Sequence, residues 1–486
     1  MALINVSNLT FAYEGSYDNI FENASFQIDT DWKLGFIGRN GKGKTTFLKL
    51  LLGEYDHQGS ISRPVDFEYF PYEVEDKSLN SIDIAFSIAP ELELWRLLKE
   101  VNLLEMEEEL LYRPFSTLSS GEQTKLLLAL LFQKESSFLL IDEPTNHLDS
   151  NARKLVGSYL DSKKSYILVS HDRGFLDGCI DHVLSINRAD IQVQKGNFSS
   201  WYLNKTRRDE AELQENERLK REIDRLNQSV RRTADWSDKV EKSKIGAYDK
   251  GYIGHKAAKM MQRSKAIEKR RQDSADKKSA LLKNIERVEK LKLHPLEYHS
   301  QRLVGLDDIA ISYGEKTACQ GVSFTISRGD RLALQGKNGS GKSSILRLIA
   351  GEKLDHSGNL SVGSGLKISL VPQNFSQLEG NLSDYAALRG IDETLFKAIL
   401  RKLDFERNQF DKDMAKFSAG QKKKVLIAGS LCESAHLYIW DEPLNYIDVF
   451  SRIQIESLLE DFGPTMLFVE HDRAFVDKIS TGIVYL

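Results

Sequence analysis

A phosphate-binding loop that occurs twice is the feature that most constrains how this chain can fold. The loop reads GRNGKGKTT at residues 38–46 and GKNGSGKSS at residues 336–344 of the 486-residue chain. Glycines in such a loop let backbone N–H groups surround phosphate oxygens at the start of a helix, and the lysine reaches the terminal phosphates. Two matches in register make a chance occurrence negligible, so we expect two phosphate-binding domains.

Other motifs repeat with the same offset. SSGEQ around Gly121 is matched by SAGQK around Gly420, IDEP by WDEP, and SHDRGF by EHDRAF, each about 300 residues later. FAYEG at Tyr13 corresponds in the same way to ISYGE at Tyr313. A nearly constant offset over all these motifs indicates that one domain was duplicated whole.

Each copy alternates short apolar runs with longer helical patterns. The runs Lys33–Ile37, Phe138–Ile141 and Ser165–Val169 predict strands, and the patterns at Thr45–Leu52 and Glu122–Phe132 predict helices. This alternation predicts an α/β fold in each copy.

The chain is expected to have three parts and no membrane segment. The boundaries that we expect are 1–204 for the first domain, 205–298 for a helical interdomain linker and 299–486 for the second domain. The longest apolar runs have about seven residues, whereas roughly 20 are needed to cross a bilayer. The start of the chain, MALINVSNLTFAYEG, has no pattern of a secretion signal. We therefore expect a cytoplasmic location, where the three scattered cysteines stay reduced.

Paired carboxylates follow a predicted strand in each copy. Asp142 and Glu143 end one apolar run, and Asp441 and Glu442 end another, where their side chains would face bound phosphates. The aspartate would serve Mg²⁺ together with the loop hydroxyl, and the glutamate would polarise an attacking water. A Glu-Pro pair after a strand can also simply cap a turn. The candidate metal ligands of this pattern are Thr45, Asp142, Ser343 and Asp441.

Histidines also recur at predicted strand ends. His171 and His471 each follow an apolar run by one polar residue, which places them at the same sheet edge as the carboxylates. An isolated histidine is more often structural, but here each repeats with Asp-Arg-x-Phe behind it, which favours catalysis.

The residues expected around the phosphates are Gly38, Asn40, Gly41, Gly43, Lys44, Thr45 and Thr46 in the first copy, and Gly336, Asn338, Gly339, Gly341, Lys342, Ser343 and Ser344 in the second.

This set of motifs, in order and twice over, resembles the ABC ATPase family. The resemblance covers both copies almost completely and implies that the chain binds ATP and Mg²⁺ and hydrolyses ATP. In that family the signature segment of one domain closes over ATP on the loop of the other. By resemblance, Ser119, Ser120 and Gly121 complete the site of Lys342, and Ser418, Ala419 and Gly420 complete the site of Lys44. Tyr13 and Tyr313 resemble the aromatic residues that stack on adenine, although a lone tyrosine in a turn can also be ordinary packing.

The two copies depart from the family pattern in different places. Gln373 occupies the position of the glutamine that senses Mg²⁺, whereas the first copy has Tyr72 there. Phe417 replaces the usual leucine before the second signature, and the second copy reads DEPLNYID where the first reads DEPTNHLD. None of these changes removes a loop lysine, a glutamate or a histidine. Both sites are therefore expected to hydrolyse ATP, at rates that can differ.

Between the copies lies a basic, helical segment. Residues 205–293 contain 26 Lys and Arg against 16 Asp and Glu, a net charge of +10, so the rest of the chain carries −14 of the total of −4. Apolar residues spaced by three and four near Leu219 and again near Leu281 predict two amphipathic helices of about 25 residues each, paired antiparallel. The pattern breaks at 242–255, where we place the tip of the hairpin.

The tip mixes cations with flat side chains, which suits RNA phosphates and exposed bases. A charged run on long helices can equally be a solvated coiled-coil face. The candidate RNA-contacting residues are Lys242, Lys244, Tyr248, Lys250, Tyr252, His255 and Lys256.

Two ABC domains with a long helical linker and no membrane segment resemble the ABC-F subfamily, and DEPLNYID with the short gap before Leu118 resembles its antibiotic-resistance branch of the Vga/Lsa type. The resemblance implies a monomer that binds the exit site of the 70S ribosome in the ATP-bound state, contacting ribosomal RNA and exit-site tRNA. Its linker displaces drugs from the peptidyl-transferase centre, and hydrolysis releases the protein. Pleuromutilins, lincosamides and group A streptogramins are the drugs that the branch suggests. A housekeeping ABC-F translation factor and the ATPase of a transporter are the alternative readings.

Overall fold

The structure is a computed structural model, and it describes residues 2–14, 19–134, 137–146, 148–186, 191–242, 269, 295–314, 316–375, 378–405 and 407–486. The chain divides into two compact units. One contains residues 1–201 and 290–486, and therefore both copies of the repeat, and the other contains residues 202–289. Over the described part of the chain, no helix is both long and apolar enough to cross a membrane.

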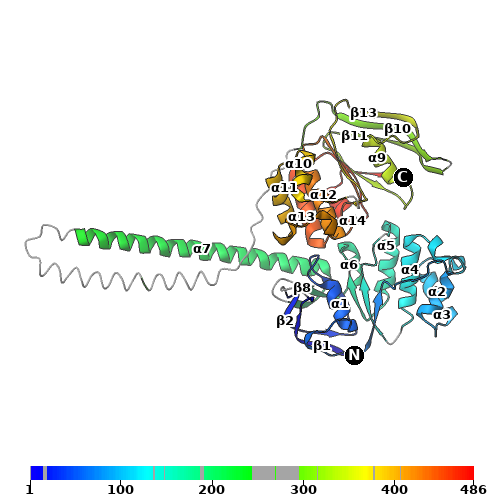
Figure 1. Cartoon of the computed structure of the whole chain (residues 1–486), viewed down its shortest axis with the longest axis horizontal. Helices are drawn as coiled ribbons and strands as arrows, with labels where there is room; N and C mark the ends of the chain where they lie inside the picture. Colours follow the sequence, from blue (N-terminus) through cyan, green and yellow to red (C-terminus); the bar gives the residue numbers. More distant parts are fainter. Residues whose placement is uncertain are drawn as a thin grey trace, which may run out of the picture. The chain divides into compact units, whose positions relative to one another are not determined.

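The first copy combines a mainly parallel sheet with a smaller antiparallel one (Figure 1). The larger sheet has the order β5-β6-β7-β3-β8-β9, in which only the β8–β9 pair is antiparallel, and the smaller has the order β2-β1-β4. Its elements are β1 (Leu3–Phe11), β2 (Phe21–Asp29), β3 (Lys33–Ile37), α1 (Lys44–Leu52), β4 (Gln58–Ile61), β5 (Asp66–Phe70), α2 (Ser81–Ile88), α3 (Leu94–Leu103), η1 (Glu108–Tyr112), η2 (Phe115–Thr117), α4 (Ser120–Leu131), β6 (Ser137–Asp142), α5 (Ser150–Asp161), β7 (Tyr166–Val169), α6 (Arg173–Cys179), β8 (His182–Ile186) and β9 (Ile191–Lys195).

The second copy repeats this architecture. Its parallel sheet has the order β14-β15-β16-β12-β17 and its antiparallel sheet the order β11-β10-β13. Its elements are β10 (Arg302–Tyr313), β11 (Lys316–Ser327), β12 (Arg331–Gln335), α9 (Lys342–Ile349), β13 (His356–Val362), β14 (Ile368–Val371), α10 (Leu382–Arg389), α11 (Glu393–Lys402), η3 (Arg407–Gln409), η4 (Met414–Lys416), α12 (Ala419–Cys432), β15 (Leu437–Asp441), α13 (Val449–Phe462), β16 (Met466–Val469), α14 (Arg473–Ile479) and β17 (Gly482–Tyr485). The α/β fold with two tandem domains of the same kind, predicted from the motifs, is confirmed.

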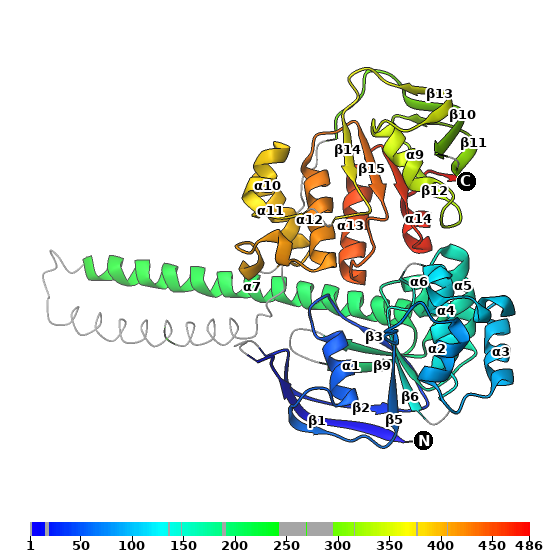
Figure 2. The same cartoon turned by 45° about the vertical axis from the view of Figure 1, so that its right-hand side comes forward.

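Strand periodicity explains how each parallel sheet is covered on both faces. In β15, Leu437 and Ile439 pack into the apolar cluster that contains α9 and the antiparallel sheet, whereas Tyr438 and Trp440 pack into the cluster formed by α11, α12 and α13. Alternate side chains of a strand point to opposite faces, so a strand buried on both faces is apolar throughout. Figure 2 shows α9 between the two sheets of the second copy, which places the start of this helix beside the carboxyl ends of the parallel strands.

The helix after the first copy is longer than the sequence predicts. Helix α7 runs over Phe198–Lys242, 45 residues, so it begins before residue 205 and exceeds the predicted length of about 25 residues. Ion pairs spaced by four residues, such as Lys205–Asp209 at 2.5 Å and Glu217–Arg221 at 3.5 Å, stabilise its charged first half without an apolar seam. Periodicity alone therefore missed the start of this helix.

Candidate active sites

In both copies a glycine-rich loop leads from the central strand into a helix. Gly43 and Gly341 have φ of 89° and 86°, a left-handed conformation that favours glycine. A Cβ atom at Gly43 would lie 2.4 Å from Ile20 Cγ2, and one at Gly341 would lie 2.8 Å from Cys319 Cβ. The loop must therefore be glycine at these positions, and its backbone N–H groups remain accessible to an anion.

The loop lysines are buried inside their own loops. Lys44 Nζ donates to the carbonyl oxygens of Gly38 at 2.7 Å and Arg39 at 3.2 Å. Lys342 Nζ donates in the same way to Gly336 at 2.9 Å and Lys337 at 2.8 Å. Burial lowers the pKa of both ammonium groups. The other predicted loop residues, Asn40, Gly41, Asn338 and Gly339, lie in the same two turns between strand and helix.

A hydroxyl and a carboxylate meet at the start of each loop helix. Thr45 Oγ1 donates to Asp142 Oδ2 at 2.8 Å, and the Ser343 hydroxyl bonds Asp441. Asp441 Oδ1 is buried without a hydrogen-bond partner, and burial raises the pKa of both aspartates. A Mg²⁺ ion at a nucleotide site takes only one or two protein oxygens and completes its shell with phosphate and water. These residues fit such an ion. In line with this, no group of three or more His, Cys, Asp or Glu residues suited to a metal occurs in the described part of the chain.

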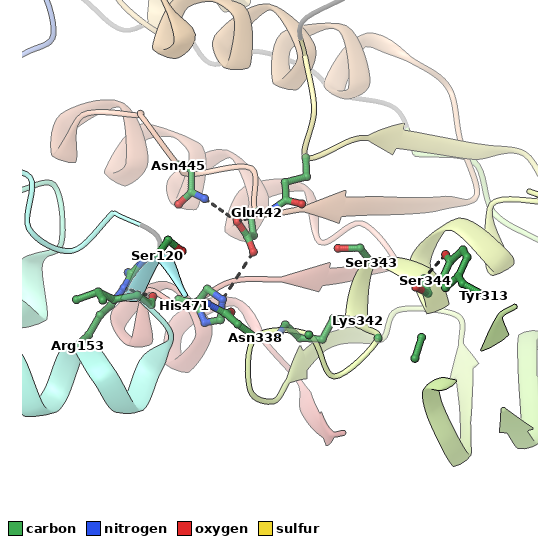
Figure 3. A pocket seen from close by; sticks show the side chains of 15 residues that line it. Ser120, Arg153, Tyr313, Asn338, Lys342, Ser343, Ser344, Glu442, Asn445 and His471 are labelled. Carbon is green, nitrogen blue, oxygen red and sulfur yellow. Dashed lines mark hydrogen bonds and ion pairs between the residues drawn. The ribbon is translucent and has the colours of Figure 1, made fainter. Parts of the chain in front are cut away.

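In the second copy the glutamate is fixed by amide groups. Glu442 Oε2 accepts hydrogen bonds from Gln373 Nε2 at 2.9 Å and from Asn445 Nδ2 at 2.7 Å, while Oε1 lies 3.7 Å from His471 Nε2 (Figure 3). Although burial alone would raise its pKa, the neighbouring His471 and the hydrogen bond from Gln373 lower the pKa of Glu442 to about 2. The carboxylate is thus ionised and oriented beside a histidine.

The first copy has the same pair with a different environment. Glu143 Oε1 lies 3.4 Å from His171 Nε2, and burial together with Asp142 raises the pKa of Glu143 to about 8. Tyr72, which replaces Gln373, donates to Glu68 Oε2 at 3.2 Å and not to Glu143. Burial and the nearby Lys44 keep the pKa of His171 well below its ordinary value. The two sites therefore differ in how their glutamates are oriented and charged.

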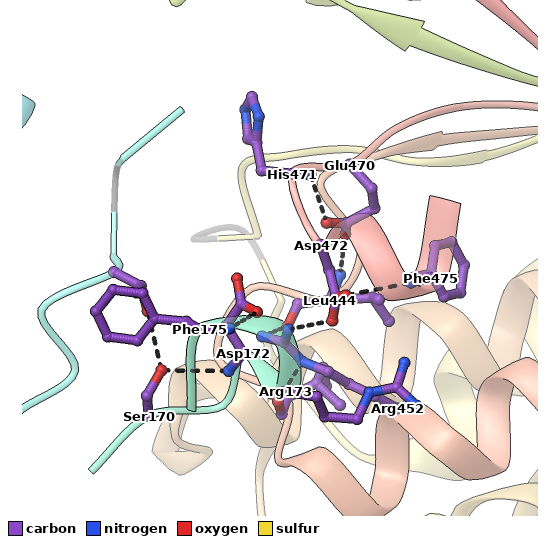
Figure 4. A network of polar contacts seen from close by, with 12 residues as sticks. Ser170, Asp172, Arg173, Phe175, Leu444, Arg452, Glu470, His471, Asp472 and Phe475 are labelled. Carbon is purple, nitrogen blue, oxygen red and sulfur yellow. Dashed lines mark hydrogen bonds and ion pairs between the residues drawn. The ribbon is translucent and has the colours of Figure 1, made fainter. Parts of the chain in front are cut away.

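Neighbouring carboxylates fix the backbone around His471. Glu470 Oε1 accepts from the Leu444 backbone N–H at 2.7 Å, and Asp472 Oδ2 accepts from Arg452 Nη1 at 3.0 Å (Figure 4). In the first copy Ser170 replaces Glu470, and Arg153 Nη1 bonds Asp172 at 3.0 Å. Each histidine is thereby fixed relative to the loop that follows its catalytic glutamate.

The site of Lys342 is a pocket that contains residues of both copies. The pocket has a volume of about 450 Å³. Ser120 and Arg153 of the first copy lie opposite the loop of the second (Figure 3), and Leu148 also lines the pocket. Ser119 precedes them as the N-cap of α4, in a capping box with Glu122. From the second copy the pocket is lined by Tyr313, Ala318, Asn338, Gly339, Gly341, Lys342, Ser343, Ser344, Gln373, Glu442, Asn445 and His471.

The loop of Lys44 contacts the second copy directly. Asn40 Nδ2 donates to the Tyr446 carbonyl at 2.7 Å, and Arg39 Nη1 lies 2.7 Å from Asp404 Oδ1. A Cβ atom on Gly420 would lie 3.0 Å from Asn40 Nδ2. Ser418 is the N-cap of α12 and Ala419 its first residue. Each predicted signature segment thus lies near the loop of the other copy.

The two predicted adenine-stacking tyrosines lie beside the loop helices. The Tyr13 hydroxyl is 2.7 Å from Thr46 Oγ1, and the Tyr313 hydroxyl donates to Ser344 Oγ at 3.1 Å. Their side chains are 42% and 47% exposed, so one ring face is accessible next to each loop.

Sequence reasoning missed several residues of these sites. Tyr69 OH donates to Asp142 Oδ2 at 3.1 Å, yet Leu370 stands at the matching position of the second copy, so no repeat pointed to it. Asn445 could have been found, because the asparagine of DEPLN recurs as Asn146. The ion pair of Arg39 with Asp404 involves a residue that lies in no motif.

The close approach at Gly420 gives a first prediction. Gly420→Ala would place its Cβ 2.5 Å from the carbonyl oxygen of Tyr446, in the same copy, and 3.0 Å from Asn40 Nδ2 of the other copy, so it would disturb the hydrogen bond by which Asn40 joins the two copies. Because both sites lie in one interface, we expect ATP turnover to fall about tenfold or more. The comparison variant is Gly121→Ala in the other signature segment, whose Cβ would meet only Leu148 Cδ2 at 3.5 Å, an ordinary contact, so a smaller loss of turnover is expected. Equal turnover of the two variants would contradict the closed interface.

The predicted linker tip lies outside this description. Lys242 is the last described residue of α7, and the predicted tip residues Lys244, Tyr248, Lys250, Tyr252, His255 and Lys256 lie outside the described residues.

Comparisons with known proteins agree with this geometry. The family model described as ABC transporter matches residues 21–146 and 319–445. The ribosome protection protein VmlR of Bacillus subtilis is 27% identical over 99% of this chain and 86% of its own length. The putative ATP-binding protein YdiF of the same organism is 26% identical over 100% of the chain and 80% of its length, and the ATP-binding protein Uup of Buchnera aphidicola is 26% identical over 98% and 79%.

Solved structures share the fold of the chain. The archaeal ribosome recycling factor aABCE1, solved with the stalk protein aP1, gives a TM-score of 0.63 at 20% identity and covers 98% of this chain and 87% of its own. An RNase-L inhibitor structure gives a TM-score of 0.62 at 19% identity and covers 99% of this chain and 87% of its own. At these identities the likeness concerns the fold alone.

Proposed function

The chain belongs to the ABC ATPase family and, within it, to the ABC-F subfamily, and from this premise we propose that it is an ATP-dependent ribosome protection factor that confers antibiotic resistance. The observation that supports hydrolysis best is the pocket in which the Lys342 loop and the Glu442–His471 pair face Ser120 of the other copy. A site assembled from two domains can couple ATP to their association.

We assign the chemistry to the residues of each site. Lys44 and Lys342 with their loop N–H groups bind the phosphates, and Tyr13 and Tyr313 contact the base. Thr45 with Asp142 and Ser343 with Asp441 would hold Mg²⁺, which would supply positive charge against the phosphates when bound. Glu143 and Glu442 orient and polarise the attacking water, and His171 and His471 fix the glutamates. Gln373 senses Mg²⁺ in the second site and donates a hydrogen bond to its glutamate, Glu442. The signature segments at 119–121 and 418–420 complete the opposite sites.

The proposed target is the 70S ribosome. The relative VmlR is named a ribosome protection protein, and the linker of this chain carries a net charge of +10 between residues 205 and 293, which suits ribosomal RNA. We propose the domain limits 1–204, 205–298 and 299–486, a tip at 242–255, and a monomer in the cytoplasm that binds at the exit site beside tRNA. In this mechanism the closed state places the tip near the peptidyl-transferase centre, a drug leaves, and hydrolysis releases the protein.

A housekeeping ABC-F translation factor is the second candidate. YdiF and Uup, named only as ATP-binding proteins, match this chain at 26% identity, almost the 27% of VmlR. Relief of drug inhibition in a translation assay separates the two candidates, because only a resistance factor restores translation when the drug is present.

The first test is co-sedimentation of the double variant Glu143→Gln/Glu442→Gln with 70S ribosomes. Blocking hydrolysis should trap the closed state, so we expect pelleting that depends on ATP. The single loop variants Lys44→Ala and Lys342→Ala, which should bind less ATP, are the controls. Absence of pelleting with ATP binding intact would refute the ribosomal function and direct attention to a membrane partner.

A further inference from the structure

Large apolar side chains are exposed on one helical segment of the first copy. Between β5 and α4, Trp95 and Tyr112 are 62% and 61% exposed. Leu79, Phe86, Leu94 and Leu103 are exposed on the same segment. In the described part of the matching segment of the second copy, Leu388 is the only large apolar side chain with comparable exposure. Contiguous exposed apolar groups on a soluble domain mark an interaction site.

These side chains belong to one small substructure, which we call the α2–α3 face (residues 79–112). The Phe115 N–H donates to the Leu79 carbonyl at 2.9 Å, and the Ser81 N–H donates to the Arg113 carbonyl at 2.9 Å. Leu79 therefore lies beside the segment that carries Tyr112. On α3, Trp95 and Leu103 are eight residues apart and share one side of the helix. Figure 2 shows α2 and α3 next to each other on the outside of the first copy.

The α2–α3 face is fixed to the domain behind it. Glu100, on the inner side of α3, accepts hydrogen bonds from Tyr159 OH of α5 and from Lys163 Nζ, just beyond the end of α5, each at 2.6 Å. A pre-formed surface of this kind loses little conformational entropy when a partner binds.

The charge of the α2–α3 face distinguishes it from its counterpart. Residues 72–118 contain 11 acidic and four basic residues, a net charge of −7, whereas the matching residues 373–417 contain eight and seven, a net charge of −1. The same segment carries exposed carboxylates: Glu91, Glu93, Glu105, Glu107, Glu108 and Glu109. An acidic surface repels a phosphate backbone, so RNA does not suit this face.

From this combination we propose that the α2–α3 face binds a protein segment rich in Lys and Arg with interspersed apolar residues. The carboxylates attract its cations, and the ring of Tyr112 can accept them over its face, as the indole of Trp95 already does for Arg96, whose Cζ lies 5.4 Å from the ring centroid. Aromatic residues at the centre of an interface also contribute most of the binding energy. The inference goes beyond the proposed function and does not depend on ribosome binding.

The test uses the full chain and two labelled probes. One is an 18-residue peptide of alternating Lys, Arg and Leu, and the other is an 18-nucleotide single-stranded RNA. Trp95→Ala/Tyr112→Ala should weaken peptide binding about tenfold and leave RNA binding and ATP turnover unchanged. Unchanged turnover also shows that the variant folds. The matched control Leu388→Ala removes an exposed apolar side chain from the second copy and should change neither affinity.

Three results would overturn the proposal. Equal peptide affinity of the double variant and the unchanged chain would show that the peptide binds elsewhere. A loss of RNA binding in the double variant would assign the face to nucleic acid. A change from dimer to monomer, measured by light scattering, would make a second copy of the chain the occupant.

Discussion

Glu442→Gln is expected to lower steady-state ATP turnover at least tenfold, whereas Glu143→Gln lowers it less than about threefold, and the double variant retains at most about 1% of it, since a general base contributes roughly 10²–10⁴-fold. The effects differ because, among the residues that the structure describes, amide donors orient only Glu442: Gln373 and Asn445 bind one of its oxygens and leave the other near His471. In the first copy Tyr72 bonds Glu68 and contributes no such donor to Glu143.

Contacts between the copies are a second reason why the first site contributes less to ATP turnover. The loop of Lys44 is already tied to the second copy through Asn40 and Tyr446 and through Arg39 and Asp404. A site whose interface is closed in this way exchanges nucleotide slowly, and product release often limits turnover. The site of Lys342 is a pocket of about 450 Å³, and Asp142 and Glu143 of the first site line another of about 620 Å³, so it is the direct contacts of the Lys44 loop that distinguish the two sites.

The measurement is steady-state ATP turnover of the two single variants and the double variant at saturating ATP. Gln373→Ala serves as the matched control, because removing the amide that orients Glu442 should reproduce part of the Glu442→Gln effect, whereas Tyr72→Ala should have little effect. If Glu143→Gln proves as damaging as Glu442→Gln, the two sites work equally and the asymmetry of the amide donors has no kinetic consequence.

The fold could be read largely from the sequence because local rules determine it. Lys33–Ile37 forms β3 with the predicted limits, and the predicted helix at Thr45–Leu52 is α1, one residue longer. Glycine at positions 43 and 341 follows from the left-handed backbone that the loop requires. Such features depend on neighbouring residues, and the duplication supplied an internal check on each of them.

Contacts across the interface could not be read in this way. Asn40 and Tyr446 are 406 positions apart, and neither periodicity nor motif spacing indicates that an asparagine in one loop bonds a carbonyl in the other copy. Tyr69 escaped notice for a related reason. Its bond to Asp142 exists only in the first copy, so the comparison of repeats, which identified the other residues, contained no signal for it.

The second large effect, on stability, is expected at an ion pair between the copies. Arg173 of α6 makes a bidentate contact with Glu456 of α13, in which Nη1 lies 3.2 Å from Oε2. The Glu456 side chain is 0% exposed and the Arg173 side chain 15% exposed. The position that corresponds to Glu456 in the first copy is Gly157, and Arg473, which corresponds to Arg173, pairs with Asp477 on its own helix at 3.4 Å.

Arg173→Ala is therefore expected to destabilise the protein by about 3 kcal/mol, because it leaves a buried carboxylate with only Lys478, at 3.6 Å, as a partner. Arg473→Ala is the matched control, since its 71% exposed side chain should contribute about 1 kcal/mol or less. Thermal unfolding measures both, and a loss of 3 kcal/mol corresponds to roughly 3 °C, at about 2.1 cal/mol/K of unfolding entropy per residue over the 486-residue chain. Adding Glu456→Gln to Arg173→Ala removes the unpaired charge and should restore part of the loss. Equal melting temperatures for Arg173→Ala and Arg473→Ala would mean that the buried pair does not join the two copies in solution.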